Sequence, residues 1–177
     1  MPLAQFNIAR ALYDLDDPRM SGFFDAVPAI NALAERSPGF IWRLIDEHGP
    51  DAPDFSHEPR MTLTLSLWKD VESLRHFTWN TIHKRFRLRT REWFEAPKAA
   101  YLVCWPIEEG HTPTGEEALA RLEELRRDGP SEQVFGTEAL AGNLNPTAPA
   151  LSRGLDPNGA DIAQSVEVPA QGRGGRI

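Results

Sequence analysis

The stretch that decides the fold is Leu65–Trp105, which reads LSLW (65–68), KDVESLRHFTWNTIHKRFRLRTREWFE (69–95) and AAYLVCW (99–105). Its two outer pieces are apolar and rich in residues that favour strands. In the middle piece, residues of one face recur at steps of three and four, which is the period of an amphipathic helix. Asp70 is placed to cap this helix and Pro97 to stop it. The stretch therefore predicts a strand, one long helix over residues 70–94, and a second strand.

The predicted helix carries a row of basic side chains on an acidic chain. Between Arg75 and Arg91 there are six Lys or Arg residues, two His and no acid, whereas the whole chain has 19 basic and 26 acidic residues. Such a row can attract an anionic ligand, but a solvated helix face has the same composition. Trp79 and His83 lie one turn apart at the edge of the buried face, where they suit a pocket wall. A structural histidine is the alternative interpretation.

Composition indicates a globular chain, with 177 residues of which 41% are apolar and 25% charged. No run of about 18 apolar residues is present, so we expect no membrane span. The N-terminus lacks the pattern of a signal peptide, which favours a cytoplasmic protein. The net charge of −7 argues against nucleic acid as the main partner. Cys104, the single cysteine, lies in an apolar segment and is expected to be a packed, inert thiol.

The N-terminal half predicts a strand, a helix and a strand of its own. Residues 3–9 alternate apolar and polar side chains, as a half-buried strand does, with Asn7 on the polar side. The apolar stripe over residues 23–34 predicts a helix that Pro28 should kink or split. Residues 40–45 predict an apolar strand in which Arg43 needs a partner or an exit to solvent.

Between the halves, residues 47–60 form a long loop with three prolines, typical either of a lid or binding loop or of a solvated connection. Residues 61–68 alternate as a third strand. After the fourth strand, Thr114 and Glu117 form a capping box that opens a helix over residues 114–127. From residue 141 to residue 177 the chain is rich in Pro, Gly, Asn, Ala and Ser and is expected to be mostly disordered.

The resulting order, βαββαβ and then a helix, predicts an α+β domain of the ferredoxin-like type over residues 1–137. In this arrangement the two long helices cover one face of the sheet. The second and fourth strands are apolar on both sides, and we expect no cover for the other face from this chain. A homodimer, with two sheets packed face to face at about 10 Å, is therefore expected.

Several segments carry a family resemblance: LAQFNIAR (3–10), SPGFIWRL (37–44), SLWKDVESLRHF (66–77), REWFE (91–95) and AYLVCWPIEEGHTPTGEEALARLEELRRDGP (100–130). Over residues 2–137 the chain resembles the bacterial domain-of-unknown-function family 3291. That family belongs to the dimeric α/β-barrel superfamily, which includes antibiotic-biosynthesis monooxygenases and haem-degrading monooxygenases. The resemblance implies a dimeric barrel with ligands between the helices and the sheet of each subunit. It implies no settled activity.

Haem-degrading members of the superfamily have an Asn on the first strand, which Asn7 matches. They also have a Trp and then a His on the second long helix, here Trp79 and His83, at a shorter spacing than in those enzymes. No glycine-rich phosphate loop is present, so the sequence predicts no cofactor. Haem bound by His83 or His76 is the alternative.

Three functions stay open, of which we favour an enzyme that acts without a metal on a small, apolar or anionic metabolite. The reaction would be a monooxygenation, or a cyclisation or isomerisation by proton transfer. His83 would be the acid or base, Asn7 would orient a carbonyl, and Arg87 would hold a carboxylate or enolate. Five further residues would bind the substrate: Trp42, Trp79, Phe86, Arg91 and Trp93. The alternatives are a haem-binding or haem-degrading protein and a non-catalytic ligand-binding dimer.

Overall fold

The computed structural model describes residues 1–47, 49–80 and 89–140. The described strands are β1 (Leu3–Arg10), β2 (Phe40–Arg43), β3 (Met61–Trp68) and β4 (Leu102–Pro106). The α-helices are α1 (Ser21–Phe24), α2 (Val27–Glu35), α3 (Val71–Asn80), α5 (Gly115–Asp128) and α6 (Thr137–Leu140), and two short 3-10 helices are η1 (Pro18–Met20) and η2 (Thr90–Glu92). The tail expected to be disordered, residues 141–177, lies outside the described residues.

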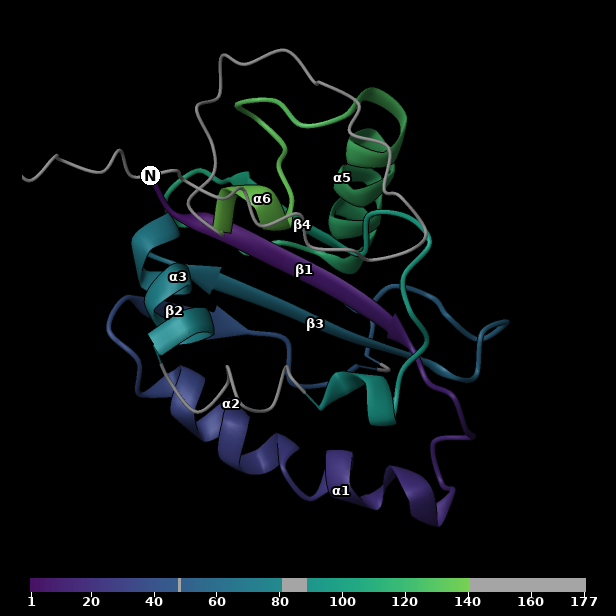
Figure 1. Ribbon diagram of the computed structural model, residues 1–177. Helices are drawn as coiled ribbons and strands as arrows, with labels where there is room; N and C mark the ends of the chain where they lie inside the picture. The colour runs from purple at the N-terminus through teal and green to yellow at the C-terminus, as the bar shows by residue number, and fades with distance from the viewer. Residues whose placement is uncertain (48, 81–88, 141–177) are drawn as a thin grey trace, which may run out of the picture. The chain divides into compact units, whose positions relative to one another are not determined.

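The four strands form one sheet in the order β2-β3-β1-β4, and every neighbouring pair is antiparallel (Figure 1). Across the central pair, Leu3 lies opposite Trp68 and Arg10 lies opposite Met61. This strand order is the one that βαββαβ connections give in a ferredoxin-like sheet. The predicted α+β fold with an additional helix is therefore confirmed.

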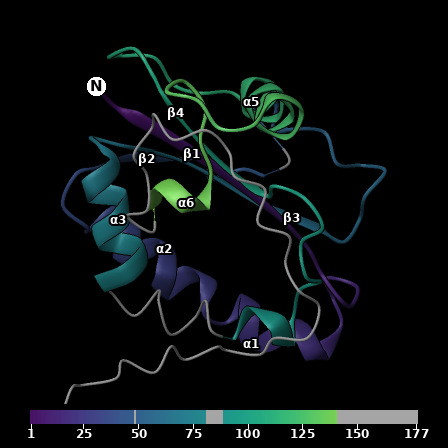
Figure 2. The same ribbon diagram turned by 45° about the horizontal axis from the view of Figure 1, so that its top comes forward.

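Alternation along the strands gives the sheet two differently covered faces. One face packs against α5 and is called the α5 face; its buried core includes Phe6, Leu65 and Leu122. The other packs against α2 and α3 and is called the α2/α3 face; its buried core includes Trp68 and Phe77. Figure 2 shows α5 on one side of the sheet and α1, α2 and α3 on the other.

The expectation that this chain supplies no cover for the second face is wrong. Ala118, Leu122 and Leu125 of α5 are buried against the sheet, as the apolar stripe of that helix allows. The Thr114 hydroxyl accepts a hydrogen bond from the Glu117 backbone N–H at 3.2 Å and so caps the helix. Because α5 buries this face, a twin subunit is not needed for that purpose, and the homodimer stays a prediction.

The single helix expected over residues 70–94 is also wrong at its C-terminal end. The described helix α3 ends at Asn80, and the backbone over Thr90–Glu92 is a 3-10 helix. Beyond it, Phe94 pairs with Ala11 in an isolated bridge, and the Glu95 N–H donates to the Arg10 carbonyl at 2.9 Å. The Phe94 N–H still donates to the Thr90 carbonyl at 2.8 Å, whereas at Glu95 the bond to the end of β1 replaces the helical one. Residues 81–88 lie outside the described residues.

In the N-terminal half, the structure agrees more closely with the predictions from the sequence. The predicted break at Pro28 is confirmed, because α1 ends at Phe24 and α2 begins at Val27, with the proline in its first turn. Arg43 of β2 finds its partner on α2, where its Nε donates to Glu35 Oε1 at 2.8 Å.

Candidate functional site

Polar side chains of β1 and β3 form one hydrogen-bonded row on the α2/α3 face. The Trp68 indole Nε1 donates to Ser66 Oγ at 3.0 Å, and Ser66 Oγ donates to Gln5 Oε1 at 3.0 Å. Gln5 Nε2 donates to Asn7 Oδ1 at 2.8 Å, and the Thr64 hydroxyl donates to the same oxygen. These five residues, Trp68, Ser66, Gln5, Asn7 and Thr64, are called the polar row below.

The polar row follows from the alternation and register of two strands. Gln5 lies opposite Ser66, and Asn7 lies opposite Thr64, so all four point to the same face. Their neighbours along the strands, such as Phe6 and Leu65, point to the α5 face and are buried there. A polar side chain at every second position of both strands therefore brings the four side chains together.

The polar row runs from a buried end to an open end. Gln5 and Ser66 are only 7% and 9% exposed, whereas Asn7 is half-buried and Thr64 is exposed. On β4 the partly buried Leu102 lies opposite Asn7 and gives the open end an apolar neighbour. An amide and a hydroxyl thus meet solvent beside an apolar side chain, which is the mixture that small-molecule sites use.

The oxygen and the nitrogen of the Asn7 side-chain amide differ in their hydrogen bonding. Its Oδ1 accepts from both Gln5 and Thr64, which uses both lone pairs. Its Nδ2 has no acceptor among the described residues. Asn7 therefore presents two N–H donors at the open end of the polar row.

The structure separates Asn7 from Trp42, which was expected to line the same pocket. A bulge between Phe40 and Trp42 shifts the β2 register, so that Trp42 lies opposite Leu67 and packs against the core of the α5 face. Without the extra residue, Trp42 would lie opposite Ser66 and share the face of Asn7. Within one chain, Trp42 and Asn7 are therefore on opposite faces of the sheet.

The other expected binding residues are spread along the region after β3. Trp79 is half-buried on α3 and has an interaction partner. Trp93 is buried in a separate cluster with Met20 and Phe94, and the Arg89 guanidinium carbon lies 4.8 Å from the centre of its ring. Trp93 is therefore a packed core residue.

Arg91 is exposed on η2, and His76, one of the two haem-ligand candidates, is exposed on α3. His83, Phe86 and Arg87 lie outside the described residues, and their predicted roles stay predictions.

Sequence reasoning missed Gln5, Ser66 and Trp68 as members of a site. The signal was present, because Gln5 and Asn7 on one strand and Thr64 and Ser66 on another are polar residues at alternate positions. Such residues are usually solvent-facing in an antiparallel sheet. Only the pairing register shows that their side chains form one hydrogen-bonded row, which ends at Trp68.

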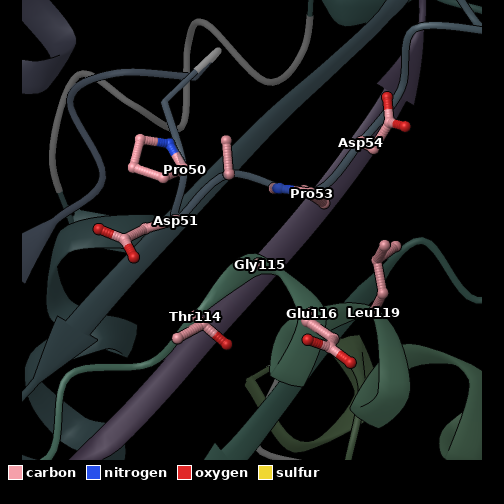
Figure 3. Close-up of a pocket in the computed structure, with 9 residues that line it drawn as sticks. Pro50, Asp51, Pro53, Asp54, Thr114, Gly115, Glu116 and Leu119 are labelled. Atoms are coloured by element: carbon pink, nitrogen blue, oxygen red, sulfur yellow. The ribbon is translucent and has the colours of Figure 1, made fainter.

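The long loop between β2 and β3 lies elsewhere, at the N-terminus of α5. Residues 50–54 and three residues of α5 border an open depression of about 420 Å³, together with Thr114 (Figure 3). The Gly115 N–H donates to the Asp51 carbonyl at 2.7 Å and attaches the loop to the helix. Asp51, Asp54 and Glu116 make the depression acidic, and none of its described lining residues is basic. It is therefore unsuited to an anionic ligand.

Cys104 is fully buried on the α2/α3 face, and burial raises the pKa of its thiol well above the ordinary value. The expectation of a packed thiol is confirmed. Among the residues that the structure describes, no group of three or more His, Cys, Asp and Glu side chains is placed to hold a metal ion. In the same part of the chain, no helix has both the length and the apolar character needed to cross a membrane.

The family described as Domain of unknown function (DUF3291) matches residues 2–145. A search of curated proteins found no match. Among solved structures, Rv0793 from Mycobacterium tuberculosis is similar at 12% identity and a TM-score of 0.46, over 63% of this chain and 100% of that chain. NE2512, a protein of unknown function from Nitrosomonas europaea, matches at 14% identity and a TM-score of 0.44, over 64% and 96%. SnoaB, a cofactor-independent oxygenase from Streptomyces nogalater, matches at 11% identity and a TM-score of 0.41, over 61% and 94%.

Proposed function

The chain belongs to the family described as Domain of unknown function (DUF3291), and we propose that it binds a small organic molecule at the open end of the polar row, against Asn7. The observation that carries this proposal is the unused Nδ2 of Asn7 beside the exposed Thr64 and the apolar Leu102. An apolar body with one oxygen acceptor would match this surface.

We further propose that the bound molecule is a substrate and that its reaction needs no metal. The Asn7 N–H donors would stabilise negative charge that develops on a carbonyl oxygen when a neighbouring carbon loses a proton. Enolates formed in this way are the common starting point of monooxygenation, cyclisation and isomerisation. His83 as the acid or base and Arg87 or Arg91 as the anion-holding group are proposals that rest on the sequence.

The test uses three forms of the protein: wild type, Asn7→Leu and the control Thr62→Val. Asn7→Leu removes both N–H donors at similar volume. Thr62 lies on the same face, but its hydroxyl donates to the Ala9 carbonyl at 3.1 Å and is not part of the polar row. Each form is purified and denatured, and the released small molecules are identified by mass spectrometry. We expect wild type and Thr62→Val to retain a common molecule that Asn7→Leu loses; equal retention by all three would refute the site.

The retained molecule then separates the three functions. Its conversion by wild type in the presence of EDTA supports the metal-independent enzyme, and its recovery unchanged supports a non-catalytic binding protein. A Soret shift on mixing the protein with hemin, lost in His83→Ala or in His76→Ala, would support the haem alternative.

We also propose that the protein acts as a homodimer in the cytoplasm. The support in the structure is apolar surface beside the edge strand β2, where Ile41 is 49% and Ile45 is 78% exposed. Light scattering coupled to gel filtration should give twice the mass of the 19.8 kDa chain. Ile45→Lys should weaken the association, and a monomer at the highest soluble concentration would refute the dimer.

A further inference from the structure

We propose that Trp68, Ser66 and Gln5 are positioning residues that hold Asn7 as a hydrogen-bond donor. The site would therefore select molecules that present a carbonyl or oxyanion oxygen and would reject those that present an N–H group at that point. This inference rests on the proposed binding site and assigns the chemical class of its ligand.

The donor-to-acceptor direction of the hydrogen bonds along the polar row is set at its buried end, by Trp68. An indole N–H can only donate, so the Trp68 bond to Ser66 has one possible direction. The indole is held in place by two aromatic neighbours, because its ring centre lies 5.2 Å from that of Phe77 and 5.3 Å from that of Phe40. Trp68 is 1% exposed, so water has almost no access to it.

Each following bond takes its direction from the one before. Ser66 Oγ accepts the hydrogen bond from the indole N–H, and its own hydroxyl donates to Gln5 Oε1. Gln5 then faces Asn7 with its Nε2, and Asn7 must accept through Oδ1. The exposed Thr64 hydroxyl donates to the same Oδ1, but a hydroxyl can also accept, so Thr64 follows the orientation of Asn7 and does not set it.

The opposite orientation of the two amides is disfavoured by Ser66. If Gln5 turned its Nε2 toward Ser66, the Ser66 hydroxyl proton would have no acceptor among the described residues. Ser66 is 9% exposed, so this proton would be buried without a hydrogen bond, which is costly. The buried hydroxyl therefore keeps Gln5, and through it Asn7, in the observed orientation.

The ligand class follows from the group that Asn7 presents. A free asparagine amide can turn its oxygen or its nitrogen toward a ligand and so serves donors and acceptors equally. An asparagine whose oxygen is already occupied twice can offer only N–H. A ligand N–H at the same place would meet a donor and lose its bond to water without replacement, which disfavours its binding.

The first experiment tests the orientation without any ligand. Neutron diffraction from a crystal of the wild-type protein grown in heavy water locates the deuterium atoms on Ser66, Gln5 and Asn7. We expect deuterium on Gln5 Nε2 directed at Asn7, and two deuterium atoms on the outward nitrogen of Asn7. An outward Asn7 oxygen would overturn the inference, whether or not the site binds a ligand.

The second experiment tests the ligand class with three probes of nearly the same shape: indanone, which carries one carbonyl acceptor, indane, which carries no polar group, and indoline, which carries one N–H donor. Binding is followed by NMR shifts of the backbone amides of residues 7 and 64, which the wild type and every variant retain. We expect wild type to bind indanone about three- to tenfold more tightly than indoline, the value of one net hydrogen bond. No preference, or no binding of indanone, would overturn the assigned class.

Two variants and a control separate positioning from simple packing. Ser66→Ala interrupts the polar row and frees Gln5 and Asn7 to turn, so the preference for indanone over indoline should fall to nearly one, while indane binds as to wild type. Asn7→Asp, which has no N–H, should reverse the preference. Thr62→Val should change neither. An unchanged preference in Ser66→Ala would show that Trp68, Ser66 and Gln5 do not set the orientation, even if Asn7→Leu abolishes binding.

Discussion

Replacing Gly115 by alanine should destabilise the protein, although the same change in a helix usually stabilises it. Gly115 is the first residue of α5, and the chain passes close to it at Ala52 and Pro53. A Cβ at Gly115 would lie 2.2 Å from Pro53 N, 2.4 Å from Pro53 Cδ and 2.6 Å from the Ala52 carbonyl carbon. Two of these three atoms belong to the backbone, so no side chain can turn aside, and the loop itself must move.

The magnitude follows from three opposing contributions. Alanine in place of glycine gains at most about 1 kcal/mol of helix propensity. Forcing an extra methyl group into a filled space costs about 1–3 kcal/mol. If the loop moves away, the 2.7 Å hydrogen bond from the Gly115 N–H to the Asp51 carbonyl is lost as well, at about 1 kcal/mol. We expect Gly115→Ala to lower the free energy of unfolding by about 1–3 kcal/mol.

The assay is urea unfolding followed by tryptophan fluorescence, with Gly136→Ala as the matched control. A Cβ at Gly136 would meet its nearest atoms, in Glu138 and Leu125, at 3.5 Å, which is ordinary contact. The control should stay within about 0.5 kcal/mol of wild type. A Gly115→Ala protein as stable as wild type, or more stable, would refute the close packing of the loop on α5.

Three further predictions concern the core, a helix cap and the cysteine. Leu122→Ala should lower the free energy of unfolding by about 2–5 kcal/mol, because Leu122 is 0% exposed between α5 and the sheet. In the same urea assay, the control Glu123→Ala, on the exposed side of the same helix, should change that free energy by less than about 0.5 kcal/mol. The Asp70 carboxylate accepts hydrogen bonds from the Ser73 backbone N–H at 2.8 Å and from the Ser73 hydroxyl, and these bonds lower its pKa. The stability that the carboxylate adds is therefore present above the unfolded-state pKa of about 4 and is lost as the pH falls further. Asp70→Ala should therefore differ from wild type by about 1 kcal/mol at neutral pH and by progressively less below pH of about 4, and a constant difference would contradict the cap. Cys104 should not react with a thiol reagent in the native protein and should react fully in denaturant, whereas rapid native labelling would contradict its burial.

Local patterns predicted the parts of the fold that depend on local physics. The alternation over β1 and β3, the break at Pro28 and the cap at Thr114 each follow from a few neighbouring residues. The face that α5 covers could not be predicted in this way. An apolar stripe with Leu122 shows that a helix must be buried but does not say against what.

The sequence predicts both Asn7 and Trp42 as residues of one site, but one irregularity of the sheet separates them within the chain. The bulge at Ile41 moves Trp42 to the α5 face, because one extra residue in a strand reverses the side to which the following side chains point. Residues 40–45 are apolar except for Arg43, and one charged residue gives no alternation of polar and apolar side chains from which a bulge could be predicted. The predicted continuation of the helix to residue 94 was wrong for a similar reason, since the pairing of Phe94 with Ala11 is a long-range contact.

The site at Asn7 is tested most directly by a crystal structure of the protein with a bound small molecule, either the one that it retains or indanone. We predict that an oxygen of the molecule lies about 2.7–3.2 Å from Asn7 Nδ2, on the α2/α3 face. A molecule bound instead in the acidic depression beside Glu116, or anywhere that leaves Asn7 Nδ2 without a contact, would contradict the assignment.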